Sequence, residues 1–286
     1  MKILVPAFLA FTIFFLSSCQ QEPDVILEDP TPPASDVDTT MLLQYIVLDA
    51  NNQSDTIDKM VFTYDAQKRI TSYFLAAGAF GNENTDYFYT GNNTLPYKYI
   101  WTWSDAIADY VDTGYVSYAN GIVSRDSVIE YKVTTNEFWG TDVVYFIPEG
   151  NNMKIIKRDY FSPGLTPPDD ERKGTLIQTR VNGNIVAQDD TAANPEVYFN
   201  RPHQTASYDN KPCPFVRIET PFPVLGYWSG IARNNPTAQK EWDVDPTSVT
   251  ELHYSYTYRA DGYPLTVMLS EPGQPPYGKG IFIYAH

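Results

Sequence analysis

Apolar and polar residues alternate with a period of two along most of the chain after residue 40. From 252 to 258 every second residue is leucine or tyrosine, and the residues between them are polar. Successive side chains of a β-strand point to opposite faces, so this period predicts strands with one aromatic face. The same alternation occurs at 129–133 and 265–269. We find no convincing helical period of ten or more residues and therefore expect only short helices.

Polar turn segments separate the predicted strands. They begin near residues 64, 89, 118, 148, 182, 208 and 258, mostly 25 to 34 residues apart. Asn, Asp and Gly accept positive φ at low cost, and Asn120-Gly121 favours a type I′ hairpin turn. This degenerate hairpin repeat predicts an all-β fold, a twisted antiparallel meander. Whether the sheet becomes an open or partly closed barrel stays open. Residues 212–242, rich in Pro, Gly and Asn, predict a long excursion over the sheet with one helical turn.

Composition narrows the class of protein. The 286 residues include 20 Lys and Arg against 35 Asp and Glu, for a net charge of −15. This balance argues against nucleic acid as a partner and against electrostatic binding to anionic lipid. Two cysteines cannot form a disulfide scaffold. An aromatic content of 15%, led by 22 Tyr, suits a β-rich core.

The N-terminus has the features of a secretory signal peptide. Lys2 gives a positive start, an apolar run covers 3–16, and small residues precede Cys19. The run is shorter than the ~20 apolar residues of a spanning helix, although an uncleaved anchor is the alternative. Residues 20–40 alternate prolines with acids, which favours an extended tether. We therefore divide the chain into a signal peptide at 1–18, a segment at 19–40 and a single β-meander domain at 41–286.

The tetrapeptide Leu16-Ser17-Ser18-Cys19 resembles the lipobox of bacterial lipoproteins. The resemblance implies that Cys19 carries a lipid and is the first residue of the mature protein. The membrane would then be a partner through this lipid. Gln20 follows in place of the aspartate that retains such proteins at the inner membrane. The resemblance therefore implies an outer-membrane lipoprotein, at the periplasmic face or at the cell surface.

A second resemblance covers the domain. Residues 64–70 look like a single YD-type repeat, and the segments 208–215, 234–237 and 254–264 resemble a three-part signature of Bacteroidota lipoproteins. Those proteins carry a domain of unknown function with a porin-like β-meander. The resemblance implies a fold and a location, but no activity.

Catalytic and metal-binding patterns are missing from the sequence. The three histidines, His203, His253 and His286, are too scattered for a metal-ligand spacing. The acidic segments 169–171 and 189–190 offer oxygen ligands for calcium but lack an EF-hand spacing. We therefore predict no catalytic residue, no metal and no cofactor.

Aromatic residues are the better candidates for a binding site. Tyr97, Tyr99, Trp101 and Trp103 alternate on one face of a predicted strand. Exposed rings of this kind stack on sugars, whereas buried rings fill the core. Core packing is the favoured interpretation, because other strands carry the same stripe. Trp228, like Trp139 and Trp242, lies near a predicted loop and is a separate candidate.

These observations predict a lipid-anchored envelope protein without catalytic activity, a binding or structural module. Its ligand would be a glycan or another envelope protein. One alternative is a carrier of an apolar ligand or lipid in the concavity of a curved sheet. Another is a glycan hydrolase, and an integral outer-membrane barrel is less favoured than either.

Overall fold

The structure is a computed structural model. It describes residues 41–77, 81–104, 109–161, 172–190, 203–217, 233–242 and 247–285. The predicted signal peptide at 1–18 and the segment at 19–40 with Cys19 lie outside the described residues, as do Trp228 and His286.

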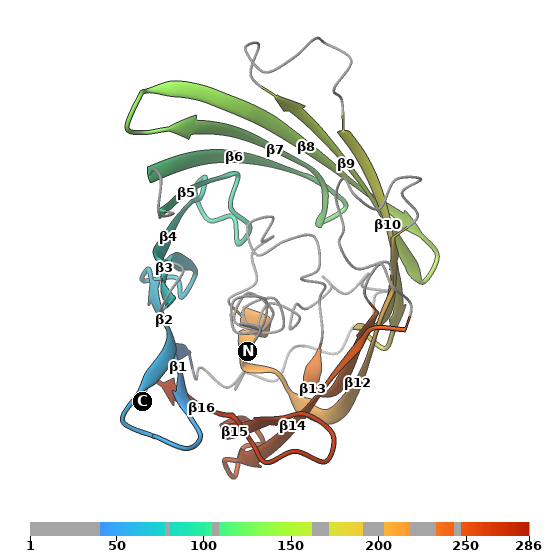
Figure 1. The fold of residues 1–286 in the computed structure, drawn as a ribbon. Coiled ribbons are helices and arrows are strands. Elements are labelled where there is room, and N and C mark those ends of the chain that lie inside the picture. The colour runs from blue at the N-terminus through green and yellow to red at the C-terminus, as the bar shows by residue number, and fades with distance from the viewer. Residues whose placement is uncertain are drawn as a thin grey trace, which may run out of the picture.

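Within the described residues, sixteen strands form one antiparallel sheet that closes on itself (Figure 1). The predicted all-β meander is confirmed, and the sheet is a closed barrel. The strands are β1 (Leu42–Asp49), β2 (Thr56–Tyr64), β3 (Ile70–Ala77), β4 (Gly81–Phe88), β5 (Lys98–Ser104), β6 (Asp109–Ala119), β7 (Ile122–Lys132), β8 (Glu137–Glu149), β9 (Asn152–Phe161), β10 (Arg172–Val181), β11 (Asn184–Asp190), β12 (His203–Pro212), β13 (Asn234–Trp242), β14 (Val249–Tyr258), β15 (Pro264–Ser270) and β16 (Gly278–Tyr284).

Each strand pairs with its neighbours in the sequence, and the first strand pairs with the last. In the closing pair, β1 and β16 run antiparallel with Ile46 opposite Ile281. Closure removes the free strand edges that would otherwise expose unpaired backbone groups. It also gives the sheet an inner and an outer face, so every strand residue belongs to one or the other.

The two rims of the barrel differ. The chain enters at Leu42 and leaves at Tyr284 on the same rim, here called the termini rim; the other is the far rim. Tight turns on the termini rim use the predicted residues, with φ of 53° at Asn120 and 76° at Gly121. Positive φ at both positions is the requirement of a type I′ turn, so the predicted hairpin turn is confirmed.

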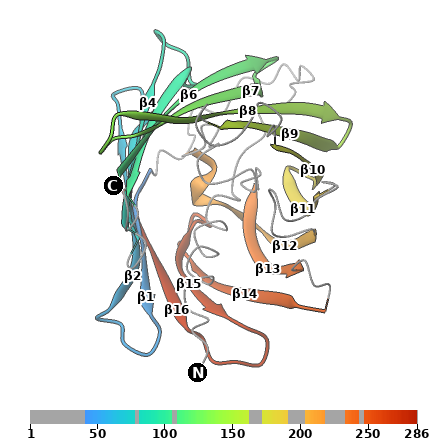
Figure 2. The same ribbon diagram turned by 45° about the horizontal axis from the view of Figure 1, so that its top comes forward.

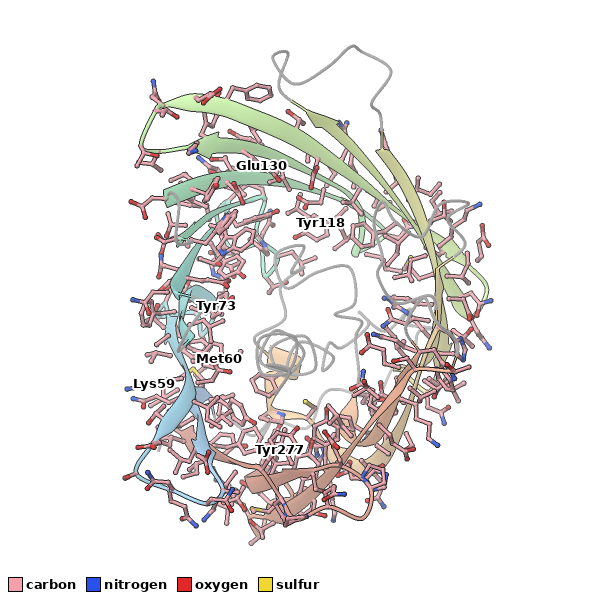
Figure 3. All side chains as sticks on the ribbon, in the orientation of Figure 1. Lys59, Met60, Tyr73, Tyr118, Glu130 and Tyr277 are labelled. Carbon is pink, nitrogen blue, oxygen red and sulfur yellow. The ribbon has the colours of Figure 1, made fainter. Side chains whose placement is uncertain are left out.

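The hydrophobic core lies inside the barrel. Lys59 and Met60 are successive residues of β2, and Figure 3 shows them on opposite sides of the wall. Inner residues such as Tyr45, Tyr73 and Leu75 are at most 1% exposed. The strongest part of this core covers the inner faces of β14 to β16 and of β1 to β5.

The connection after β12 turns into the barrel. Its 3₁₀ helix η2 (Pro214–Arg217) lies inside the ring of strands in both ribbon views (Figures 1 and 2). The Phe215 ring packs against Tyr45, Phe62 and Phe282, with centroids 5.7, 6.3 and 6.0 Å away. The predicted excursion of 212–242 over the sheet is therefore wrong for its described parts. One part enters the interior, and Asn234–Trp242 is strand β13.

Tyrosines fasten hairpins at the termini rim, which explains the repeat in the sequence. In five hairpins a tyrosine near the end of the second strand donates its hydroxyl to a backbone carbonyl near the start of the first strand. We call these bonds tyrosine latches. They join Tyr64 to Leu42 (2.7 Å), Tyr89 to Ile70 (2.8 Å), Tyr118 to Pro96 (2.6 Å), Tyr208 to Ile185 (2.6 Å) and Tyr284 to Pro264 (2.8 Å).

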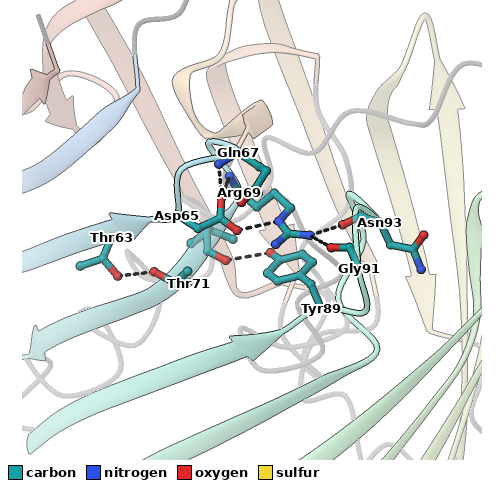
Figure 4. A network of polar contacts seen from close by, with 9 residues as sticks. Thr63, Asp65, Gln67, Arg69, Thr71, Tyr89, Gly91 and Asn93 are labelled. Atoms are coloured by element: carbon teal, nitrogen blue, oxygen red, sulfur yellow. Dashed lines mark hydrogen bonds and ion pairs between the residues drawn. The ribbon is translucent and has the colours of Figure 1, made fainter.

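The turn at 65–69 adds an ionic contact to this rim (Figure 4). Asp65 accepts hydrogen bonds from the backbone N–H of Arg69 at 2.9 Å and from its Nε at 2.7 Å. The guanidinium also donates to the carbonyls of Gly91 and Asn93 and lies 4.4 Å from the centroid of the Tyr89 ring. Burial works against the charged form of Asp65, but the hydrogen bonds from Arg69 outweigh it and lower the pKa of that carboxyl. Arg69 thus joins two consecutive turns.

Candidate functional site

Three aromatic rings form a row on the inner wall. Trp101 and Trp103 alternate with outward-facing residues of β5, and Tyr110 is opposite Trp103 on β6. The centroids of Trp101 and Trp103 are 5.5 Å apart. Those of Trp103 and Tyr110 are 4.0 Å apart, with ring planes within 11° of parallel. The two indoles are only partly buried. The row lies toward the far rim, because Trp103 is near the end of β5 and Tyr110 near the start of β6.

Two carboxyl groups hold the indoles in place. The Nε1 of Trp101 donates to Oε2 of Glu83 at 3.2 Å, and the Nε1 of Trp103 donates to Oδ2 of Asp112 at 3.0 Å. In the registers Glu83 is opposite Trp103 and Asp112 is opposite Trp101, so each indole reaches the diagonal carboxyl group. We call these four residues and Tyr110 the ring–carboxyl site. The fixed indoles are a rigid surface for stacking.

The other two predicted stacking residues lie elsewhere. Tyr99 is on the same inner face but only 1% exposed, and its hydroxyl donates to Oδ2 of Asp126 at 3.0 Å. This ring is part of the core. Tyr97 precedes β5 near the termini rim and is 47% exposed. The structure therefore brings Trp101 and Trp103 together with Tyr110 and leaves Tyr97 and Tyr99 outside that row.

The inner wall carries carboxyl groups whose protonation equilibria are strongly shifted. Burial, aided by the nearby charge of Asp142, raises the pKa of Asp112 to about 7 against the hydrogen bond from Trp103. Burial also raises the pKa of Asp58 to about 7, with a smaller contribution from the charge of Glu83. Glu83 itself has a raised pKa because it is buried. Asp58 and Asp112 therefore change protonation near neutral pH, and alternation alone gave no sign of it.

A row of amides covers the inner wall on the other side of the barrel. The Nε2 of Gln178 on β10 donates to Oε1 of Gln188 on β11 at 2.8 Å. Gln188 in turn donates to Oε1 of Gln204 on β12 at 2.9 Å. Arg180 donates to Oε1 of Gln178 at 2.9 Å, which closes one end of the row. Sequence reasoning missed this row, although inward positions occupied by glutamine in three successive strands were a signal for it.

His203, His253 and Trp242 lie on the outer wall. His203 contacts Asp189 at 2.5 Å, and its ring centroid is 4.6 Å from that of Trp242. His253 contacts Glu251 at 2.9 Å. In the described part of the chain, no three His, Cys, Asp or Glu side chains gather as metal ligands would. The described residues also include no helix with the length and apolar character of a membrane span.

The chain matches no known protein-family model and no curated protein sequence. It is similar in structure to a porin-like protein from Bacteroides vulgatus ATCC 8482, with 12% identity over 86% of this chain and 99% of that chain, and a TM-score of 0.49. A porin-like protein from Bacteroides uniformis ATCC 8492 is also similar, with 12% identity over 85% of this chain and 98% of that chain, and a TM-score of 0.37. Both likenesses are too distant to bear on activity, and neither supports the predicted YD-type repeat or lipid anchor.

Proposed function

We propose that this protein is a lipid-anchored envelope protein whose barrel is a non-catalytic binding module. The signal-like N-terminus and the lipobox-like segment ending at Cys19 support the anchor. The chain enters the barrel at the termini rim, so a tether attached there leaves the far rim facing away from the membrane. The lipid would hold the protein at the outer membrane, on its periplasmic face or on the cell surface.

The outer wall supports a barrel that stands in water. Lys59 points outward from the middle of β2 (Figure 3). On β13 and β14, Lys240 and His253 both contact Glu251 at 2.9 Å on the outer face. A lipid-facing wall is an apolar band, and charged groups in its middle are costly. This outer wall therefore suits a water-exposed barrel held by a lipid anchor better than a barrel whose strands are inserted in the membrane.

The ring–carboxyl site carries the proposal of binding. Two stacked indoles, fixed by carboxyl groups and partly exposed on the inner wall, offer an apolar aromatic surface beside hydrogen-bond acceptors. Sugars combine an apolar ring face with a rim of hydroxyl groups, so this arrangement suits a glycan. The amide row from Gln178 to Gln204 adds donors and acceptors on the facing wall.

The two alternatives draw less support. A carrier of apolar ligands needs unfilled apolar space, but Phe215 occupies the apolar interior between Tyr45, Phe62 and Phe282. A glycan hydrolase needs a proton donor with a raised pKa and a second carboxyl group across the bond. Asp112 meets the first requirement, but its Oδ2 is engaged by Trp103. Binding is thus the function that the geometry supports best.

A glycan array and a thermal-shift panel of envelope and dietary polysaccharides test binding. We expect a ligand whose affinity falls about tenfold, or about 1.4 kcal/mol, in both Trp101→Ala and Trp103→Ala. Trp242→Ala on the outer wall is the matched control and should bind as the parent does. Turnover of a polysaccharide, with no ligand found, would replace the binding module by a hydrolase.

Metabolic labelling with an alkyne fatty acid tests the anchor. We expect label on the parent protein and none on Cys19→Ser, and protease treatment of whole cells then distinguishes the cell surface from the periplasm. Label that persists in Cys19→Ser would refute lipidation at this residue.

A further inference from the structure

Buried polar atoms without partners lie beside the ring–carboxyl site. Asp58 is 1% exposed, and neither of its carboxyl oxygens has a hydrogen-bond partner among the residues that the structure describes. Asp112 is 2% exposed, and its Oδ1 has none. The hydroxyl of Tyr45, fully buried on the neighbouring strand β1, is also without a partner. Unsatisfied buried groups cost free energy, so a native protein usually gives them a ligand or an ordered water.

The unpartnered oxygens restrict the chemistry of that ligand. In its ionised form a carboxyl group only accepts hydrogen bonds, so a ligand that stabilises this form must donate them. The charge on this wall is one-sided: Asp58, Glu83, Asp112 and Glu130 face inward from β2, β4, β6 and β7. Lys132 is the basic residue that shares the face, opposite Tyr110.

The row of aromatic rings further restricts the chemistry of the ligand. An ammonium group over the face of an indole or phenol is attracted by the quadrupole of the ring. Trp101, Trp103 and Tyr110 place three such rings next to the carboxyl groups. A neutral hydroxyl donates a hydrogen bond to a carboxylate but leaves its buried negative charge uncompensated. An ammonium group donates the hydrogen bond and also compensates the charge.

We infer that the ring–carboxyl site and Asp58 select ligands with protonated amino groups, and that the glycans it takes are sugars with free amines. This inference rests on the proposed function and names its substrate class. Neutral and N-acetylated sugars of the same backbone are the disfavoured ligands.

A second consequence follows from the titrating groups. The described titratable groups that face this region are Tyr45, Asp58, Tyr73, Glu83, Tyr87, Tyr99, Tyr110, Asp112, Asp126, Glu130, Lys132 and Asp142. Burial raises the pKa of Asp58, Asp112 and Asp126 to about 7. A bound cation stabilises the ionised forms and lowers these pKa values, so binding should release protons.

Calorimetry on the full mature chain in detergent tests the inference with three β-1,4-linked tetrasaccharides: glucosamine, N-acetylglucosamine and glucose. Near pH 6, about one unit below the raised pKa values, we expect the glucosamine tetramer to bind at least about tenfold tighter than the other two. Titrations in two buffers of different ionisation enthalpy should show proton release for the glucosamine tetramer alone.

The outcomes separate the two claims. Equal binding of all three tetramers overturns the amine preference and keeps the glycan-binding function, whereas no binding in this and the wider panel overturns both. Asp112→Asn should reduce the preference about tenfold, and Glu83→Gln does so independently if the first variant fails to fold. Asp86→Asn, on the outward face of β4, is the control and should keep the preference. A preference that survives both inner substitutions contradicts the inference.

Discussion

The Tyr99 hydroxyl bonds to Oδ2 of Asp126 at 3.0 Å, although a whole strand lies between them. Tyr99 is on β5 and Asp126 on β7, and the ring crosses β6 where Gly114 pairs with Tyr99. A Cβ atom at Gly114 would lie 1.9 Å from the ring carbon Cζ. The inner wall therefore depends on a glycine at position 114, where the Tyr99 ring lies over the neighbouring strand.

Gly114→Ala should destabilise the barrel by about 2–4 kcal/mol. The methyl group displaces the Tyr99 ring and removes the hydrogen bond from its hydroxyl to Asp126, which is 0% exposed. Urea unfolding measures the loss. Adding Tyr99→Leu should restore part of it, because the shorter side chain no longer needs the space. An additive double mutant would show that the ring and the glycine are not coupled.

Removing the hydroxyl group of a tyrosine latch should lower the stability of the barrel. Tyr64→Phe and Tyr118→Phe should each lower the free energy of unfolding by about 1 kcal/mol, because each removes one hydrogen bond to a partly buried carbonyl. Tyr115→Phe is the control, since its ring is 46% exposed on the outer face. Thermal unfolding of the three variants compares them, and equal midpoints would contradict a stabilising role for the latches.

Asp58 should make stability fall with rising pH. Its pKa is about 7 in the folded state against 3.8 ordinarily, so the folded state binds the proton more tightly. Its contribution is complete below about pH 4 and lost as the pH passes about 7, with an upper limit of about 4 kcal/mol.

Asp58→Asn should therefore raise the unfolding free energy by about 1–2 kcal/mol at pH 8 and leave it nearly unchanged at pH 4. Asp86→Asn on the outer face gives the baseline. A gain for Asp58→Asn that is the same at both pH values would show that the carboxyl does not titrate as described.

Arg69 joins the turns at 65–69 and 91–93, so Arg69→Ala should cost about 2 kcal/mol. Arg69→Lys should recover less than half of the loss, because an ammonium group does not reproduce the planar set of donors. Urea denaturation supplies the values, with Arg125→Ala on the outer face as the control. Full recovery with lysine would indicate that only the charge matters.

Alternation and turn chemistry were sufficient to predict an antiparallel meander of hairpins, although not strand β13. Leu252 and the tyrosines at every second position up to 258 face inward, and Asn120-Gly121 turns as predicted. The repeat near residues 64, 89, 118 and 208 reflects the latches, since each of these positions is a tyrosine that fastens a hairpin. Local sequence thus encodes the hairpins.

Neither the closure of the barrel nor the ring–carboxyl site could be predicted from local sequence patterns. Pairing of Ile46 with Ile281 joins the two ends of the domain, and no short segment records it. Strand β13 was missed because Asn235 and Pro236 are residue types typical of loops. In the barrel Asn235 is buried, and its Nδ2 donates a hydrogen bond to Asp209. Pro236 lies next to a register shift between β12 and β13. Trp103 and Asp112 are on different strands, so their contact depends on register.

Pairing of β1 with β16 closes the barrel and creates the inner face on which the ring–carboxyl site lies. Ile46 and Ile281 are opposite each other on these strands and face outward. The double variant Ile46→Cys/Ile281→Cys should form an intramolecular disulfide under mild oxidation, detected by mass spectrometry after proteolysis. The pair Ile46→Cys/Thr175→Cys, on distant strands, should not. Cross-linking of the first pair is the predicted result, and its failure in the folded protein would contradict a closed barrel.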